Sequence, residues 1–356
     1  MKLSDFYTAR AVADNWSEVY SNEIPYIGPS LFTPRKKSGL SVAWLKGSKG
    51  LPVSLMPSAF DAKPAFRDRI GVSKVETELA FFRESMLVKE KDEQDIMELE
   101  NKGADDPYLQ DILRRIFDDT GTLRDGAMVV PERMAFQLLA PASGDAKIHI
   151  AANGVVYDYN YDPHGTWKAN NYSALTGEDL WSAPTTSKPL NDFRTVTRKA
   201  LSQNGTRLTR AIMSQATFDY LLENEQIKSA ILAQNATANI FLDDSLLATF
   251  IKLKSGLTLI VYEKLYKDEA GESHSFYPDG YVTFLPDESV GTMWYGVTPE
   301  ERSARQAGNQ LSTFNTGIAI TVNYTHEAPY QTITTASEVL APSFERMDEV
   351  FVMKVA

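Results

Sequence analysis

The chain has 356 residues, of which 43% are hydrophobic, and it contains no cysteine. This composition is typical of a folded chain with a sizeable core, and it excludes disulfides and cysteine-ligated zinc. The net charge of −11, from 36 basic and 47 acidic residues, argues against a sequence-specific DNA-binding protein but not against a container for DNA. The N-terminus lacks the apolar core of a signal peptide, and no run of about 18 apolar residues occurs, so we expect a soluble protein made in the cytoplasm.

Charge is concentrated in two adjacent blocks of opposite sign. Between Arg35 and Lys74 nine basic residues outnumber two acidic ones, giving a net charge of +7. Between Glu84 and Asp106 nine acidic residues outnumber three lysines, giving −6. Such blocks either neutralise each other within one chain or steer one subunit onto its neighbour, and charge alone does not decide between the two.

The N-terminal segment is predicted to be a short helix followed by an irregular extension. Apolar residues recur at steps of three and four over residues 4–20, which predicts an amphipathic helix. Residues 24–39 hold three prolines and two glycines, which predicts an extended arm. Such an arm cannot form its own core, so we expect it to lie along another surface.

A long two-stranded excursion is predicted next. Residues 41–45 and 51–56 read as strands around a short turn, and residues 75–82 could form the returning strand. The proline-broken segment 57–69 gives the excursion a basic tip. An isolated hairpin is marginally stable in water, so we expect this one to need a partner surface, from the same subunit or the next.

Helices are predicted in the middle of the chain. The acidic stretch 84–100 is one. Asp106 and Pro107 mark the start of another, which Gly121 can stop. A further helix follows residue 122, and Pro131 either kinks it or delays its start.

Residues 147–161 form the clearest hairpin, because Asn153-Gly154 is a strong tight-turn dipeptide between apolar alternations. Helices are predicted over 190–201 and 216–232. Strands are predicted over 207–214, in a strand-turn-strand unit over 257–287, and over 317–324 and 350–355. Helices and hairpins in this order indicate an α+β protein rather than a doubly wound sheet.

The sequence offers no catalytic or metal-binding motif. The four histidines lie far apart, and HExxH, GxSxG, GxxxxGK[ST] and GxGxxG patterns are absent. The acid pairs Asp243-Asp244 and Glu300-Glu301 are interpreted as solvated turn acids. A catalytic glycosidase pair is defined by the distance in space between two carboxyl groups, which neighbouring positions in a sequence do not give. We therefore expect no enzyme activity, no cofactor and no metal.

Three segments, in order along the chain, resemble the lambda-type major capsid protein E family of tailed bacteriophages. They are LPVSLMPSAFDAKPAFRDRIG with FFRESMLVKEKD (51–71 and 81–92), TLIVYEKLYKDEAGESHSFYPDGYVTFLPD (258–287) and SEVLAPSFERMDEVFVMKVA (337–356). The resemblance implies the α+β HK97-type capsid fold. Its implied parts are an N-terminal arm (1–45), an extended loop (46–86), a spine helix with the peripheral domain (87–188), an axial domain (189–315) and C-terminal strands returning to the peripheral domain (316–356). Pro131 departs from the straight, uninterrupted spine helix of that fold.

The same resemblance implies a structural subunit of an icosahedral phage capsid, assembling into hexamers and pentamers around viral DNA without sequence-specific binding. Implied partners are other copies of the chain, scaffolding and portal proteins and, as a further candidate, a decoration protein. The alternative is an encapsulin-like shell around cargo enzymes. We expect contacts between subunits to come from the two charge blocks, through Lys63, Arg67, Asp68, Arg69, Glu84, Glu90, Asp92 and Glu93.

Overall fold

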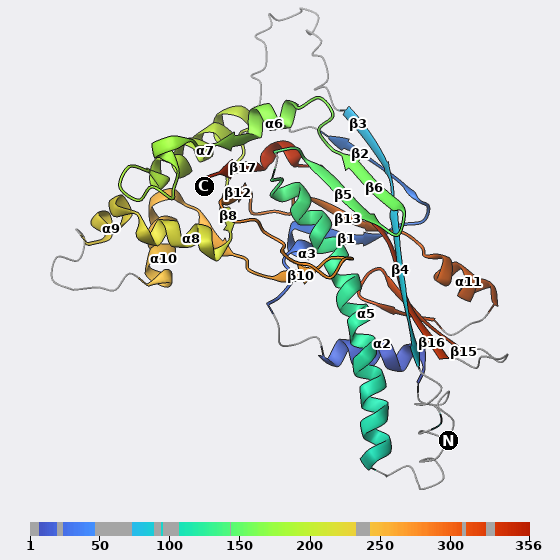
Figure 1. Cartoon of the computed structure of the whole chain (residues 1–356). Coiled ribbons are helices and arrows are strands. Elements are labelled where there is room, and N and C mark those ends of the chain that lie inside the picture. The colour runs from blue at the N-terminus through green and yellow to red at the C-terminus, as the bar shows by residue number, and fades with distance from the viewer. Residues whose placement is uncertain are drawn as a thin grey trace, which may run out of the picture.

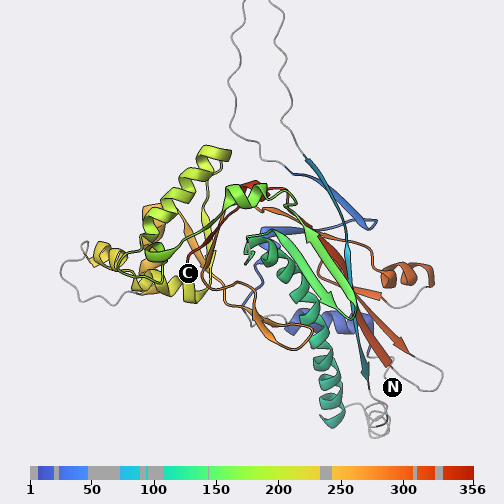
Figure 2. The same cartoon turned by 45° about the horizontal axis from the view of Figure 1, so that its top comes forward.

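The structure is a computed structural model that describes residues 7–19, 24–46, 73–88, 94, 107–142, 144–232, 243–307, 311–324 and 332–356. Two sheets organise these residues, and Figures 1 and 2 show them side by side, with helices α7 to α10 at one end and α11 at the other. None of the described helices is long and apolar enough to cross a membrane.

The larger sheet has six strands and is antiparallel except for one parallel pair. Its path is β1 (Phe32–Lys36), β13 (Gly291–Tyr295), β16 (Thr332–Ser343), β15 (Ile318–Tyr324) and β14 (Leu311–Phe314), while β4 (Ala80–Val88) also pairs with β16. The parallel pair is β1 with β13. This pairing brings the N-terminal and C-terminal parts of the chain into one sheet.

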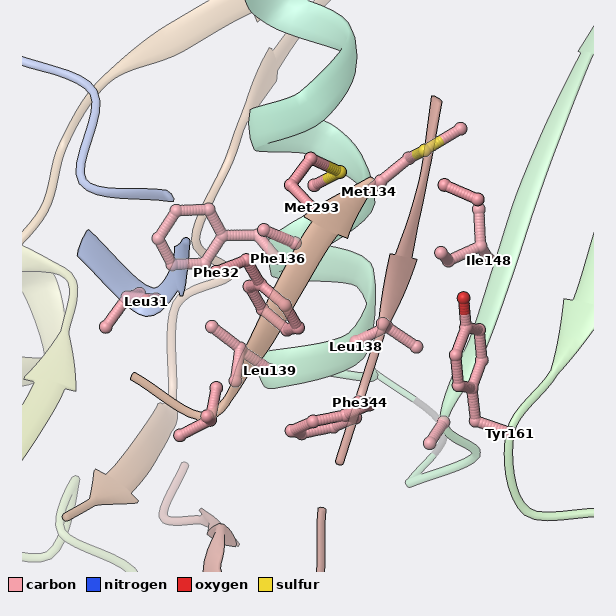
Figure 3. Packing of buried hydrophobic residues seen from close by; sticks show 14 of the residues in the cluster. Leu31, Phe32, Met134, Phe136, Leu138, Leu139, Ile148, Tyr161, Met293 and Phe344 are labelled. Carbon is pink, nitrogen blue, oxygen red and sulfur yellow. The ribbon is translucent and has the colours of Figure 1, made fainter. Parts of the chain in front are cut away.

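A long helix, α5 (Pro107–Leu139), packs on this sheet. Its C-terminal part buries Met134, Phe136, Leu138 and Leu139 almost completely. Figure 3 shows these side chains among Phe32, Met293, Phe344 and Ile148, which come from strands and from the segment that follows β16. This cluster is the core of the larger unit.

The smaller sheet has five strands and its own core. Its order is β7 (Tyr172–Ala174), β17 (Phe351–Lys354), β12 (Tyr281–Leu285), β8 (Arg210–Met213) and β9 (Thr258–Val261). The helices packed with it are α7 (Pro189–Asn204), α8 (Gln215–Glu223), α9 (Glu225–Leu232) and α10 (Asp244–Ser255). Trp181, Phe193 and Phe284 stack edge to face at the centre of this second core.

Smaller elements complete the described chain. The hairpins are β2 (Ser41–Lys46) with β3 (Ser73–Glu78), β5 (Lys147–Ala152) with β6 (Val155–Asn160), and β10 (Leu265–Lys267) with β11 (Ser273–Ser275). The remaining helices are α2 (Ala9–Val19), α3 (Gly28–Leu31), α6 (Thr166–Asn171), α11 (Pro299–Ala307) and two short 3₁₀ turns, Gly177–Asp179 and Met347–Glu349.

Several local predictions are confirmed. Asn153 and Gly154 both have positive φ, 50° and 79°, as a two-residue hairpin turn requires. Helix α7 ends at Gly205 with φ 68°, as expected of a left-handed C-cap. The strands expected over 41–45, 317–324 and 350–355 are β2, β15 and β17.

Other local predictions are wrong. Residues 84–88 are not helical: they continue β4, because each residue from Ala80 to Val88 pairs with a residue of β16. Gly121 does not stop a helix, and α5 runs through both Gly121 and Pro131 without a break. The helix expected over 216–232 is two helices, because Asn224 is buried between them and donates its amide hydrogens to Ser187.

The N-terminal segment packs on its own chain rather than lying apart from it. Trp16 of α2 is fully buried, and its ring nitrogen donates to Thr120 of α5 at 3.1 Å. Phe32 of β1 is also fully buried. The described parts of the expected arm therefore share a core with the rest of the subunit.

The two sheets take their strands from interleaved parts of the chain. β13 and β14 lie before residue 315 but belong to the larger sheet. β17 lies after residue 316 but belongs to the smaller one.

Candidate functional site

The sequence-predicted contact residues lie mostly outside the described residues. Lys63, Arg67, Asp68, Arg69, Glu90, Asp92 and Glu93 are in that group. Glu84 is described: it is exposed in the middle of β4, where it pairs with Ala336 of β16. Of the predicted contact residues, Glu84 is thus the one that the structure describes, and it lies on β4.

The main-chain groups of β4 alternate between its two edges. The Tyr157 hydroxyl of β6 accepts a hydrogen bond from the Phe81 N–H at 3.0 Å and donates one to the Phe81 carbonyl at 3.1 Å. Both groups of Phe81 therefore point away from β16. In an antiparallel pair every second residue is oriented alike, so Arg83, Ser85 and Leu87 also direct their main-chain groups outward.

Side chains fix β4 on both of its faces. The Phe82 ring packs against the Tyr157 ring with centroids 5.5 Å apart. On the opposite face, Arg83 reaches Glu300 of α11 at 3.4 Å, and the Ser85 hydroxyl meets that of Thr335 at 2.8 Å. The strand is thus held firmly while its outer edge faces away from the sheet.

A second group of hydrogen bonds joins the N-terminal segment to α5 through Glu132. Its carboxylate accepts hydrogen bonds from the Ile27 N–H at 3.0 Å, the Gly28 N–H at 2.8 Å and the Tyr262 hydroxyl at 2.6 Å. Burial raises the pKa of Glu132, and the hydrogen bonds from Tyr262, Gly28 and Ile27 lower it part of the way back. A Cβ at Gly28 would collide with the Glu132 carboxylate, so any larger residue there would displace that carboxylate.

Lys264 holds the same segment from the other side. Its ammonium donates to the Ile24 carbonyl at 2.7 Å and lies 4.0 Å from the centroid of the Tyr26 ring. Further along the segment, Lys36 forms an ion pair with Glu301 of α11 at 2.7 Å. The Glu301 side chain is only 3% exposed, so its interpretation as a solvated turn acid is wrong.

A third feature is the carboxyl group of Glu338 in β16. The residue is buried, and neither of its carboxyl oxygens has a hydrogen-bond partner. Burial raises its pKa well above the usual value for glutamate. A buried, unpartnered carboxyl group is costly in its charged form, so this strand position favours the protonated acid.

Asp268, Glu272 and His274 are the group among the described residues that could hold a metal ion. The Asp268 carboxylate accepts from the main-chain N–H groups of Ala270 and Glu272 and contacts the His274 ring at 2.8 Å. These bonds lower the pKa of Asp268, above all the one to His274. These contacts hold the turn between β10 and β11 together, and this structural role accounts for the arrangement.

Sequence reasoning missed both buried glutamates. Each is a lone acid within an apolar stretch, Glu132 after Val129 and Val130 and Glu338 before Val339 and Leu340. Because charged residues are rarely fully buried unless paired, an acid in such a run is a signal that could have been read. The partners of Glu132 lie more than 100 positions away in the sequence, so they could not be predicted from it.

Comparison with a protein family gives a long match. The model of a family described as phage major capsid protein E matches residues 8–314. None of the curated proteins compared with the chain matches it.

Solved structures share the fold over nearly the whole chain. One is a phage-related protein from Bordetella bronchiseptica RB50, 13% identical, with a TM-score of 0.58 over 98% of this chain and 97% of that one. Another is a protein assigned as the capsid protein of a prophage in E. coli CFT073, 14% identical, with a TM-score of 0.55 over 98% of this chain and 99% of that one. At these identities the likeness concerns the fold.

Proposed function

Because the chain belongs to the phage major capsid protein E family, it is a structural subunit of a phage capsid, and we propose that it assembles with copies of itself into hexamers and pentamers that close around DNA. The family and the α+β HK97-type capsid fold expected from the sequence are both confirmed. The observation that carries the proposal is the family match over residues 8–314. Such a closed shell requires contacts that join different surfaces of neighbouring subunits.

Assembly of the full chain tests this proposal. The purified subunit, with a scaffolding protein supplied, is followed by light scattering and imaged by electron microscopy. We expect closed particles with five- and six-membered capsomers. A compact monomer under every assembly condition would contradict the proposal.

We further propose roles for the two units of the subunit. The larger sheet with α5 would form the peripheral domain, and the smaller sheet with α7 to α10 the axial domain, whose loops meet at the capsomer centre. Their separate cores support this division. Residues 291–314 then belong to the peripheral part and β17 to the axial part, because that is where their strands pair.

We also propose that the basic block docks on the acidic block of an adjoining subunit. Lys63, Arg67 and Arg69 would face the stretch from Glu84 to Glu100, with Asp68, Glu90, Asp92 and Glu93 in the same contact. The net charges of +7 and −6 and the exposed position of Glu84 support it. The charges would act mainly by steering subunits during assembly, since single exposed pairs contribute only about 0–1 kcal/mol.

The wider setting follows from the capsid role. We propose that the subunit acts without catalysis, assembles in the host cytoplasm, and meets scaffolding and portal proteins there, with a decoration protein as a further candidate. The family match favours a phage capsid over an encapsulin-like enzyme container.

A further inference from the structure

We propose that the outer edge of β4 is an assembly surface on which an extended segment of a second copy of the chain adds a strand. This inference rests on the proposed self-assembly and deepens it, because it names the main-chain groups that make one contact. It differs from the proposed charge contact in that hydrogen bonds of the backbone, rather than side-chain charges, define the docking site.

The edge offers three alternate residues, Arg83, Ser85 and Leu87, with outward main-chain groups. Phe81 is fixed in the outward orientation by its two bonds to Tyr157, and the unbroken register with β16 repeats that orientation at Arg83, Ser85 and Leu87. Within the described residues, no hydrogen bond involves the main-chain groups of these three residues on that side. Three N–H groups and three carbonyl groups therefore form a row to which an added strand can hydrogen-bond.

As far as the described residues go, the chain closes this row at one end and leaves it accessible at the other. The Tyr157 hydroxyl satisfies both groups of Phe81 and so takes the position that an added strand would otherwise occupy there. Beyond Phe81, Arg83, Glu84 and Ser85 are exposed, and Leu87 is 51% exposed. An added strand would thus cover residues 83–87 and stop at Tyr157.

Edge strands of soluble proteins are usually protected against such pairing by proline, by bulges or by short length. β4 has nine residues, without proline, and pairs with β16 at every position from Ala80 to Val88. It is therefore a long, regular edge of the kind that accepts strand addition. The chain belongs to a family of capsid proteins. An unprotected edge in such a subunit is accounted for if a neighbouring subunit covers it after assembly.

The occupant is a second copy of this chain, through an extended segment of its basic block. β4 leads directly into the acidic block, which begins at Glu84 and carries a net charge of −6, whereas residues 35–74 carry +7. Charge complementarity would bring that segment to this edge, and the main-chain bonds would then fix its register. Within that block, residues 51–56 are predicted to form a strand, and we expect such a strand to need a partner surface because an isolated hairpin is marginally stable in water.

Amide hydrogen exchange at single-residue resolution tests the proposal on the unmodified chain. In the free subunit the Arg83, Ser85 and Leu87 amides exchange at least tenfold faster than the Phe82, Glu84 and Met86 amides, which face β16. In assembled particles the three outward amides become protected to a similar extent. If particles form and these amides still exchange as in the free subunit, the edge is not an interface, although the capsid function stands.

A proline scan of the edge gives a second test. Ser85→Pro removes an outward N–H without removing a bond to β16, while Ser85→Ala loses the same hydroxyl contact and keeps the N–H. We expect Ser85→Ala to assemble like the wild type and Ser85→Pro to assemble at least tenfold more slowly, with a thermal midpoint for the free subunit close to that of Ser85→Ala. Equal assembly rates for both variants would overturn the proposal. Failure of the wild type itself to assemble would count against the proposed function instead.

Discussion

The carboxylate of Glu132 accepts a hydrogen bond from the main-chain N–H of Gly28 at 2.8 Å, across 104 positions of the sequence. One side chain of α5 thereby fixes the segment that enters β1. The same carboxylate also holds the Ile27 N–H and the Tyr262 hydroxyl, so a single residue joins three parts of the chain.

Removing this carboxylate should loosen the N-terminal segment. Glu132→Ala removes the acceptor of three hydrogen bonds, two of them buried. Because the loss of a buried bond costs about 1–3 kcal/mol, we expect the free energy of unfolding to fall by about 3 kcal/mol. Glu132→Gln keeps one acceptor oxygen and should lose about 2 kcal/mol. Urea unfolding of the full subunit measures both, with limited proteolysis near residue 27 as a second readout. Glu223→Gln, an exposed change on α8, should stay within about 0.5 kcal/mol of the wild type; an unchanged urea midpoint for Glu132→Ala would contradict the assigned role.

Glu338 should make stability depend on pH. Its pKa is raised in the folded state by burial, so the folded protein binds this proton more tightly than the unfolded one. The resulting stabilisation is complete below the unfolded pKa, about 4.3, and is lost as the pH rises through the folded pKa. Glu338→Gln cannot titrate, so the wild type should lose stability relative to this variant with rising pH, by at most about 1.4 kcal/mol per pH unit.

Urea unfolding of the wild type and of Glu338→Gln, in parallel from about pH 5 to pH 9, measures this difference. The comparison cancels the titration of other buried acids, including Glu132 and Glu345, whose pKa values burial also raises. A difference in unfolding free energy that stays constant over the series would show that Glu338 does not titrate as its burial requires.

Charge reversal tests the docking of the two blocks. Arg67→Glu with Arg69→Glu should slow shell formation at low salt, where screening is weakest, and leave the subunit folded. Reversing Glu84, Glu90 and Glu93 to lysine in the same chain should restore assembly. The control reverses Arg194 and Arg198, two exposed residues of α7, which changes the net charge equally. Normal assembly of the first double variant, measured by light scattering, would refute the pairing, and equal slowing by the control would assign the effect to net charge.

Two glycine substitutions should act in opposite directions. Gly121 lies inside α5, and a Cβ there would come no closer than 3.9 Å to Arg124. Gly121→Ala should therefore stabilise the subunit by about 0.5–1 kcal/mol, the usual gain in a helix interior. Gly28→Ala should destabilise it, because the new Cβ would displace the Glu132 carboxylate. Thermal unfolding of both variants checks the signs, and a stabilised Gly28→Ala variant would mean that the carboxylate can move without loss.

Local signals predicted the elements that local chemistry determines. The Asn153-Gly154 turn needs only residues that accept positive φ, and the end of α7 needs only Gly205, so both were readable from the sequence. The resemblance of three segments to a capsid family predicted the fold class, which propensity alone leaves open.

Long-range pairing explains the errors. Residues 84–88 are predicted to be helical as part of the acidic stretch 84–100, but β16, some 250 positions later, pairs with them and makes them a strand. Gly121 is a helix stop only where tertiary packing does not continue the helix, and here Leu123 and Met128 are buried beyond it. The partners of Glu132 and the orientation of the main-chain groups of β4 both depend on the tertiary pairing of distant segments. No local sequence pattern predicts that pairing.

The parallel pairing of β1 with β13 also constrains how the chain can fold while it is being made. Phe32 pairs with Gly291 and Lys36 with Tyr295, so the first strand of the larger sheet has no partner until about 260 further residues have been synthesised. At roughly 5–20 residues per second, translation leaves Phe32 and its apolar neighbours without their final contacts for about 13–50 s. We therefore expect the larger sheet to form late, after the helices of the smaller unit, and the nascent N-terminal segment to be the portion of the chain most in need of a chaperone on the ribosome.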